Sequence, residues 1–73
     1  MGKRYKYIDT VRESFEYIIT ELPNNSGWKL SIYDNELDIE IWPSEIYSDF
    51  VKAKGELVKI SKGNYKQVSL VEV

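Results

Sequence analysis

The chain contains no cysteine and no histidine, and these absences restrict the chemistry that it can perform. Without cysteine there is no disulfide and no thiolate ligand for a metal ion. Without histidine the commonest general base is missing, so a serine nucleophile would lack its usual activator. Glycine is scarce, and Gly55 and Gly63 do not form a phosphate-binding loop. We therefore expect no enzyme activity, no metal site and no cofactor.

Long apolar runs and a strong excess of one charge are also missing. No run approaches the roughly 20 apolar residues that a membrane span requires. Residues 1–7 lack the apolar core of a signal peptide. Ten basic and twelve acidic residues give a formal charge of −2, which is too balanced to indicate nucleic-acid binding from bulk charge. The expectation is a cytoplasmic protein that does not bind membranes.

The length favours one small domain over residues 1–73. A domain of this size buries only about 60% of its unfolded surface, so its core needs support. With no disulfide available, oligomerisation is the remaining support, and a homodimer is the simplest form of it.

The stretch over residues 28–43 alternates apolar and polar side chains on both sides of Asp34 and Asn35. This period of two predicts a β-hairpin with one apolar face and one acidic face. Asp34 and Asn35 tolerate the positive φ of a two-residue turn. In that register Leu30 faces Ile39, and a slip of one residue would place the apolar side chains on the wrong face.

Two helices are predicted, one on each side of this hairpin. Over residues 10–22 apolar side chains recur at steps of three and four, with Asp9 as one candidate N-cap. A shorter helix is predicted from residue 44 to about residue 54, with Gly55 as its C-terminal cap. Residues 1–7 are predicted to form a basic arm that is either flexible or a short edge strand.

A second hairpin is predicted over residues 57–73, with a three-residue loop at residues 62–64. The predicted fold is α+β in the order helix–hairpin–helix–hairpin, with a four-stranded antiparallel sheet packed on one face by two helices. The expected core consists of Val11, Phe15, Ile18, Ile19, Leu22, Leu30, Ile32, Leu37, Ile39, Ile41, Ile46, Phe50, Val58, Ile60, Val68 and Leu70.

The acidic face of the first hairpin is the main functional lead. Glu36, Asp38 and Glu40 would project from one strand face at two-residue steps, about 6.8 Å apart. Such a row could occupy a surface that binds DNA phosphates, with Trp42 as an interface anchor. The alternative is an ordinary solvated sheet face. The candidate partner-binding residues are Asp34, Glu36, Asp38, Glu40, Trp42, Glu45 and Asp49.

An apolar strip on the outer face of the second hairpin is a candidate dimer interface. Its residues are Leu57, Tyr65, Val71 and Val73. In a chain this small, an exposed apolar strip indicates a partner or a second copy. The alternative is that the first helix or residues 1–7 cover it.

Three functional hypotheses follow. The leading one is a non-catalytic protein-binding module, specifically a phage or mobile-element inhibitor that acts as a DNA mimic on a host replication, transcription or defence protein. An amino-acid bias typical of AT-rich genomes favours such a source. The competing hypothesis is a small nucleic-acid-binding regulator that uses residues 1–7 with Lys59, Lys62 and Lys66. The third is a structural subunit that dimerises.

Overall fold

The computed structural model describes residues 2–41 and 45–72, and the described chain is mostly β-structure, with 49% strand. Trp42, proposed above as an anchor, and Val73, proposed for a dimer interface, lie outside the described residues. The elements in chain order are β1 (Lys3–Asp9), β2 (Phe15–Glu21), a short 3-10 turn η1 (Pro23–Asn25), β3 (Trp28–Asp34), β4 (Ile39–Glu40), β5 (Glu45–Tyr47), α1 (Phe50–Ser61) and β6 (Tyr65–Glu72).

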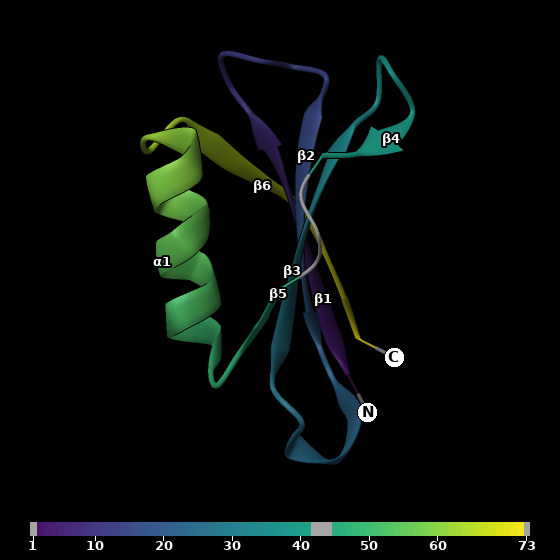
Figure 1. Cartoon of the computed structure of the whole chain (residues 1–73), viewed down its shortest axis with the longest axis vertical. Helices are drawn as coiled ribbons and strands as arrows, with labels where there is room; N and C mark the ends of the chain where they lie inside the picture. Colours follow the sequence, from purple (N-terminus) through teal and green to yellow (C-terminus); the bar gives the residue numbers. More distant parts are fainter. Residues whose placement is uncertain (1, 42–44, 73) are drawn as a thin grey trace.

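The described strands form one antiparallel sheet in the order β4-β3-β2-β1-β6, and β5 also pairs with β3. The short strands β4 and β5 therefore share one edge of the sheet, and β6 forms the other. The helix α1 connects these two edges and packs on one face of the sheet (Figure 1). Lys3 is directly paired with Glu72, so the start of β1 lies beside the end of β6.

The core lies between α1 and the three central strands. Tyr7, Tyr17 and Ile32 are directly opposite one another on β1, β2 and β3, and each is at most 2% exposed. Side chains two residues apart on a strand share a face. Ile19 and Leu30 therefore form the next row of the same face, and both are buried.

The helix contributes Ala53 and Leu57 to this core, both with no exposed surface. Phe50 packs against the rings of Tyr5 and Trp28, with centroid distances of 4.6 and 5.3 Å. These helix positions, three and four residues apart, form one face. Burial of Leu57 alone contributes about 1.5–3 kcal/mol to folding.

The sheet and the helix correct the predicted fold. The structure has one α-helix and a six-stranded sheet among the described residues, not two helices on four strands. Residues 10–22 do not form a helix, because residues 10–14 are a connection and Phe15–Glu21 is strand β2. The aromatic and β-branched residues of β2 favour a strand. Their positions in the sequence also fit the spacing of one face of a helix.

The second predicted helix starts and ends later in the sequence than expected, and it includes residues that were assigned to the second predicted hairpin. The helix begins after Asp49, whose side chain accepts a hydrogen bond from the Lys52 N–H at 2.8 Å, and it runs through Gly55 to Ser61. It ends at Lys62, which is left-handed with φ 55°. Residues 57–61 are therefore helical, and the described residues contain no second hairpin of the predicted kind. Residues 3–7 do not form an edge strand either, because they belong to β1, which lies between β2 and β6.

The first hairpin forms, but with a longer loop than predicted. Asp34 pairs with Ile39, and Tyr33 pairs with Glu40, so residues 35–38 form the connection. The register differs from the predicted one by four residues, an even number. The alternation of faces is therefore preserved, and Ile41 still packs against the core.

The predicted core is correct only in part. Ile18, Ile19, Leu30 and Ile32 are buried, and Phe15, Ile41, Phe50 and Ile60 pack against the buried cluster. Several expected core residues are exposed because their elements differ from the prediction: Val11, Leu37, Ile39, Ile46, Val58, Val68 and Leu70. The buried apolar residues that the prediction omitted are Tyr7, Tyr17, Ala53 and Leu57.

Candidate protein-binding surface

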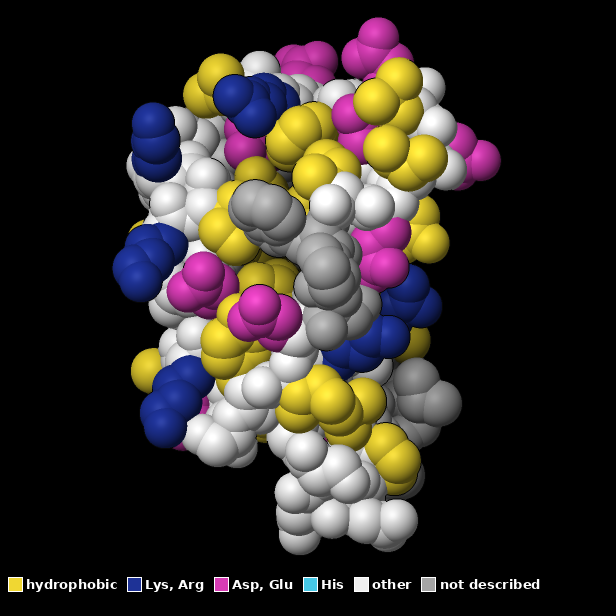
Figure 2. Space-filling model, viewed as in Figure 1, with side chains coloured by type: hydrophobic (Ala, Val, Ile, Leu, Met, Phe, Trp, Pro, Cys, Tyr) yellow, Lys and Arg dark blue, Asp and Glu magenta, His cyan; other side chains and the backbone are white. Residues whose placement is uncertain are grey.

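The outer edge of β3 is acidic over a long stretch of sequence. Residues 30–51 contain six acidic side chains and no lysine or arginine. Since the whole chain has a formal charge of −2, the remaining residues carry +4. Figure 2 shows acidic and hydrophobic side chains together near β4, and lysine or arginine side chains along the side formed by α1. We call the part of this stretch that contains Glu36, Asp38, Glu40 and Glu45 the acidic edge.

The predicted row of carboxylates does not lie on one strand. Glu36 and Asp38 belong to the exposed loop between β3 and β4, where Asp38 is left-handed with φ 55°. Glu40 lies on β4 opposite Tyr33, and Glu45 lies on β5 opposite Leu30. The structure therefore places these four residues along one edge of the sheet, but without the regular two-residue spacing.

Two of the predicted partner-binding carboxylates have local structural roles. Asp34 is only 8% exposed, and its Oδ1 accepts hydrogen bonds from the N–H groups of Glu36 and Leu37 at 3.0 and 3.4 Å. Asp49 caps α1. Asp34 therefore organises the loop that displays the acidic edge, and Asp49 fixes the start of the helix.

Large apolar side chains are exposed along the same edge. Leu37 and Ile46 are each 64% exposed, and Ile39 is 49% exposed. Tyr33, opposite Glu40, is also exposed. Leu37, Ile39 and Ile46 were predicted to be core residues, so their exposure corrects that prediction. Asp34 and Asn35 indicated where the loop begins, but they did not indicate how long it is.

Hydrogen bonding within the acidic edge affects one tyrosine. The Tyr47 hydroxyl donates a hydrogen bond to the Glu45 Oε2 at 3.1 Å. Burial, followed by this bond and the nearby negative charge, raises the pKa of Tyr47 to about 12. Tyr47 therefore stays protonated at neutral pH.

The residues predicted as a dimer interface are not brought together as a strip. Leu57 is fully buried on α1, and Tyr65 packs edge-on against Tyr7 at a centroid distance of 5.8 Å. Val71 lies on β6 and is 50% exposed. The predicted strip required a second hairpin, which is absent from the described residues.

The basic residues that were proposed to bind nucleic acid lie in two separate parts of the structure. Lys59 and Lys62 belong to α1 and its C-terminal cap. Arg4 and Lys66 instead lie on the sheet face opposite the helix, as the strand register requires. Lys6 shares that face and forms an ion pair with Glu16 at 2.7 Å.

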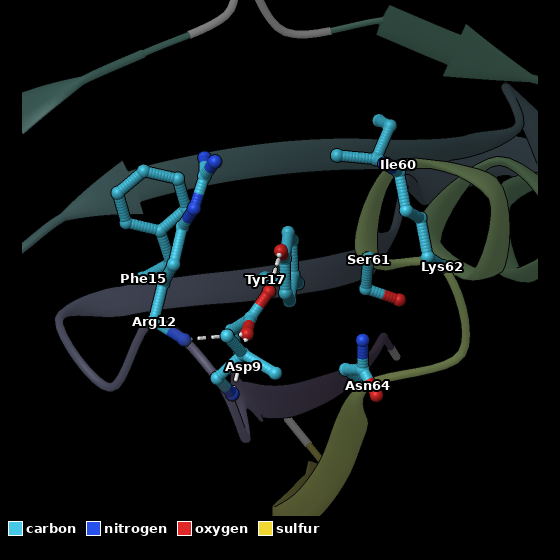
Figure 3. A pocket seen from close by; sticks show the side chains of 9 residues that line it. Asp9, Arg12, Phe15, Tyr17, Ile60, Ser61, Lys62 and Asn64 are labelled. Atoms are coloured by element: carbon cyan, nitrogen blue, oxygen red, sulfur yellow. Dashed lines mark hydrogen bonds between the residues drawn. The ribbon is translucent and has the colours of Figure 1, made fainter.

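A cavity of about 230 Å³ lies between the β1–β2 connection and the end of α1 (Figure 3). The Oδ1 atom of Asp9 accepts hydrogen bonds from the N–H groups of Val11 and Arg12, each at 2.8 Å. The Tyr17 hydroxyl donates to the Oδ2 of Asp9 at 2.6 Å. The Arg12 guanidinium lies 5.3 Å from the centroid of the Phe15 ring.

The pKa values of these groups do not suit acid–base catalysis. Burial alone would raise the pKa of Asp9, but the hydrogen bonds from Arg12, Tyr17 and Val11 outweigh it and lower the pKa. Burial and the bond to Asp9 raise the pKa of Tyr17. Asp9 is thus a weaker base than a free aspartate, and Tyr17 is a weaker acid than a free tyrosine. The two groups hold the turn together.

Within residues 2–41 and 45–72 no group of three acidic side chains is placed to hold a metal ion. The helix of the described chain is too short to cross a membrane.

The chain matches none of the protein-family models, curated proteins or solved structures with which it was compared.

Proposed function

We propose that this chain is a non-catalytic protein-binding module whose acidic edge occupies a basic, nucleic-acid-binding surface of a larger protein. The observation that carries the proposal is the charge of residues 30–51, which contain six acidic residues and no basic one. Exposed Leu37 and Ile46 lie among these charges and can make apolar contact once the partner has docked.

Charge complementarity explains how such a module would recognise its partner. A negative edge is attracted to a positive surface over several ångströms, which raises the association rate. Apolar side chains near the centre of an interface then contribute most of the affinity. Such binding does not require a strict match to the spacing of DNA phosphates, because Glu36 and Asp38 lie in a loop.

Affinity capture with a matched control tests the proposal. The test variant combines Glu36→Gln, Asp38→Asn and Glu40→Gln, which neutralises the acidic edge while keeping side-chain size. The control variant combines Glu13→Gln, Glu21→Gln and Glu72→Gln, which changes the net charge equally at positions in the β1–β2 connection, on β2 and on β6, away from this edge.

Each protein is immobilised and exposed to lysate from a bacterium with an AT-rich genome. We expect wild type and control to retain the same protein, and added duplex DNA to release it. We expect the test variant to bind it roughly tenfold more weakly or worse, about 1.4 kcal/mol. Retention by the test variant at physiological salt would show that the acidic edge is not the binding surface.

The sheet face opposite α1 supports a second candidate, namely direct nucleic-acid binding. Arg4, Lys29 and Lys66 lie on this face together, and exposed Tyr33 offers a ring for base stacking. A gel shift with single-stranded DNA and RNA separates the two candidates. Loss of a shift in the Arg4→Gln, Lys29→Gln variant, with retention in Lys52→Gln, Lys59→Gln, would favour this second candidate.

A further inference from the structure

Strand β6 is the exposed edge of the sheet on the side away from the acidic edge. It spans Tyr65–Glu72 and is the longest strand of the described chain. It pairs with β1 on one side, and no described strand pairs with its other side. An unpaired edge presents backbone N–H and C=O groups to any extended chain that approaches it.

The side chains of β6 favour an apolar and uncharged neighbour. Val68, Leu70 and Val71 are 47%, 46% and 50% exposed. Lys66 is the one charged residue between positions 65 and 71, and no acidic residue occurs between positions 57 and 71. Two copies of this edge would therefore meet with little electrostatic repulsion.

The opposite edge cannot serve in self-association. Strands β4 and β5 have only two and three residues, and Glu40 and Glu45 lie on them. Two copies of that edge would oppose carboxylates to carboxylates, which destabilises strand pairing. Of the two edges, only β6 suits a second copy of the same chain.

We propose that β6 pairs antiparallel with β6 of a second copy around a two-fold axis near Ser69. In this register Val68 of each chain lies opposite Leu70 of the other chain, so the contact contains two equivalent pairs. The two Lys66 side chains are far apart. Such an isologous contact is closed, so it produces a dimer and not a fibre. Both helices then lie on the same face of one continuous sheet.

The bulge in β6 is compatible with this arrangement. The partners in β1 change register between Lys6 and Tyr7, which leaves Val68 without a direct partner on β1. A bulge bends an edge and limits how far pairing can extend. The bend favours one short contact around Ser69 over an unlimited stack of copies.

Sedimentation of the full chain at several concentrations tests the proposal. The test variant combines Val68→Lys and Val71→Lys, which adds like charges to the proposed contact. The control combines Val11→Lys and Val51→Lys at exposed sites elsewhere, which makes the same chemical change. We expect wild type and control to form dimers whose fraction rises with concentration, and the test variant to remain monomeric.

Hydrogen exchange of the wild type gives a second readout that does not depend on the variants folding. We expect the amides of residues 66–71 to become more protected as the concentration rises, and those of the β3–β4 loop to stay unchanged. A wild type that is monomeric into the near-millimolar range would overturn the proposal. So would a test variant that folds and still forms dimers.

Discussion

Asp9 shows how one side chain directs the chain between the first two strands. Its carboxylate is 5% exposed and accepts hydrogen bonds from two backbone N–H groups and from the Tyr17 hydroxyl. An aspartate that binds N–H groups two and three residues ahead favours a turn. Asp9 also appears in the sequence analysis as a helix cap, because helix caps use the same hydrogen bonds.

We expect Tyr17→Phe to lower the free energy of unfolding by about 1.5–3 kcal/mol, because it removes a buried hydrogen bond to a charged group. Urea denaturation at neutral pH measures this change. Tyr33→Phe is the control, since Tyr33 is exposed, and its effect should stay within about 0.5 kcal/mol. Equal effects of the two substitutions would mean that the bond to Asp9 adds nothing.

Asp9 should also make stability depend on acid pH. Its pKa is lower in the folded chain than in the unfolded chain, where it is about 3.9. Its stabilising contribution is therefore complete above that value and is lost as the pH falls through the lower, folded-state pKa. Glu16 acts in the same direction: burial opposes the shift, but the hydrogen bond from Lys6 lowers its pKa.

We expect the wild type to be more stable than Asp9→Asn at neutral pH and the difference to shrink below a pH of about 4. Urea titrations at a series of pH values measure both proteins. A difference in unfolding free energy that stays constant from neutral to acid pH would show that the charge of Asp9 is not responsible.

At the scale of elements, the alternation of Leu30 and Ile32 was enough to predict strand β3 and its buried face. The loop that follows could not be predicted from alternation, because registers that differ by an even number of residues leave the same side chains inside. In the longer loop, the Asp34 carboxylate accepts hydrogen bonds from the N–H groups of Glu36 and Leu37. Those bonds depend on the backbone position, which the pattern does not specify.

Strand β2 and helix α1 were mispredicted because local patterns were ambiguous. Residues 15–21 fit both a strand and one side of a helix, and pairing with β1 and β3 decides between them. Gly55 was predicted to be the C-terminal cap of the helix, but packing of Leu57 in the core extends the helix past it. Tertiary contact overrides propensity in both cases.

Gly55 provides a direct test of the helix. Because it lies inside α1 and an added Cβ would meet nothing within 4 Å, we expect Gly55→Ala to stabilise the chain by about 0.5–1 kcal/mol. A helix that ended at Gly55 would predict the opposite sign. Thermal and urea denaturation measure the difference.

Gly27→Ala is the companion variant for the same measurement. Gly27 has φ 119°, and an added Cβ would lie 2.6 Å from the Tyr47 carbonyl oxygen and 2.9 Å from the Ile46 Cγ2. We expect a loss of roughly 1–3 kcal/mol from backbone strain and from displacement of β5. A neutral result would mean that β5 does not pack at this distance in solution.

At the scale of the whole molecule, charge is separated between the acidic edge and the remainder of the chain. The candidate surface could be predicted from the sequence as a run of acidic residues without lysine or arginine. Its shape could not, because β4 and β5 both pair along β3 and bring Glu40 and Glu45 to one edge. Glu40 and Glu45 come together only because both of their strands pair with β3, and no local sequence pattern indicates this arrangement.

We expect binding of the captured partner to weaken steeply as salt rises, because ions screen exposed charges beyond about 8 Å at physiological ionic strength. Binding by the variant with neutralised Glu36, Asp38 and Glu40 should depend much less on salt. Titration calorimetry at several salt concentrations measures both slopes. Parallel slopes would indicate that the attraction arises elsewhere on the molecule.

The pairing of the first strand with the last has a consequence for the order in which the chain folds. Strands β1, β2 and β3 follow one another and can associate while the chain is being synthesised, but β1 lacks its second neighbour until residues 65–72 emerge. Contacts between distant parts of a chain form slowly. Completion of the sheet should therefore be the late step of folding, and β1 carries an open edge until residues 65–72 pair with it.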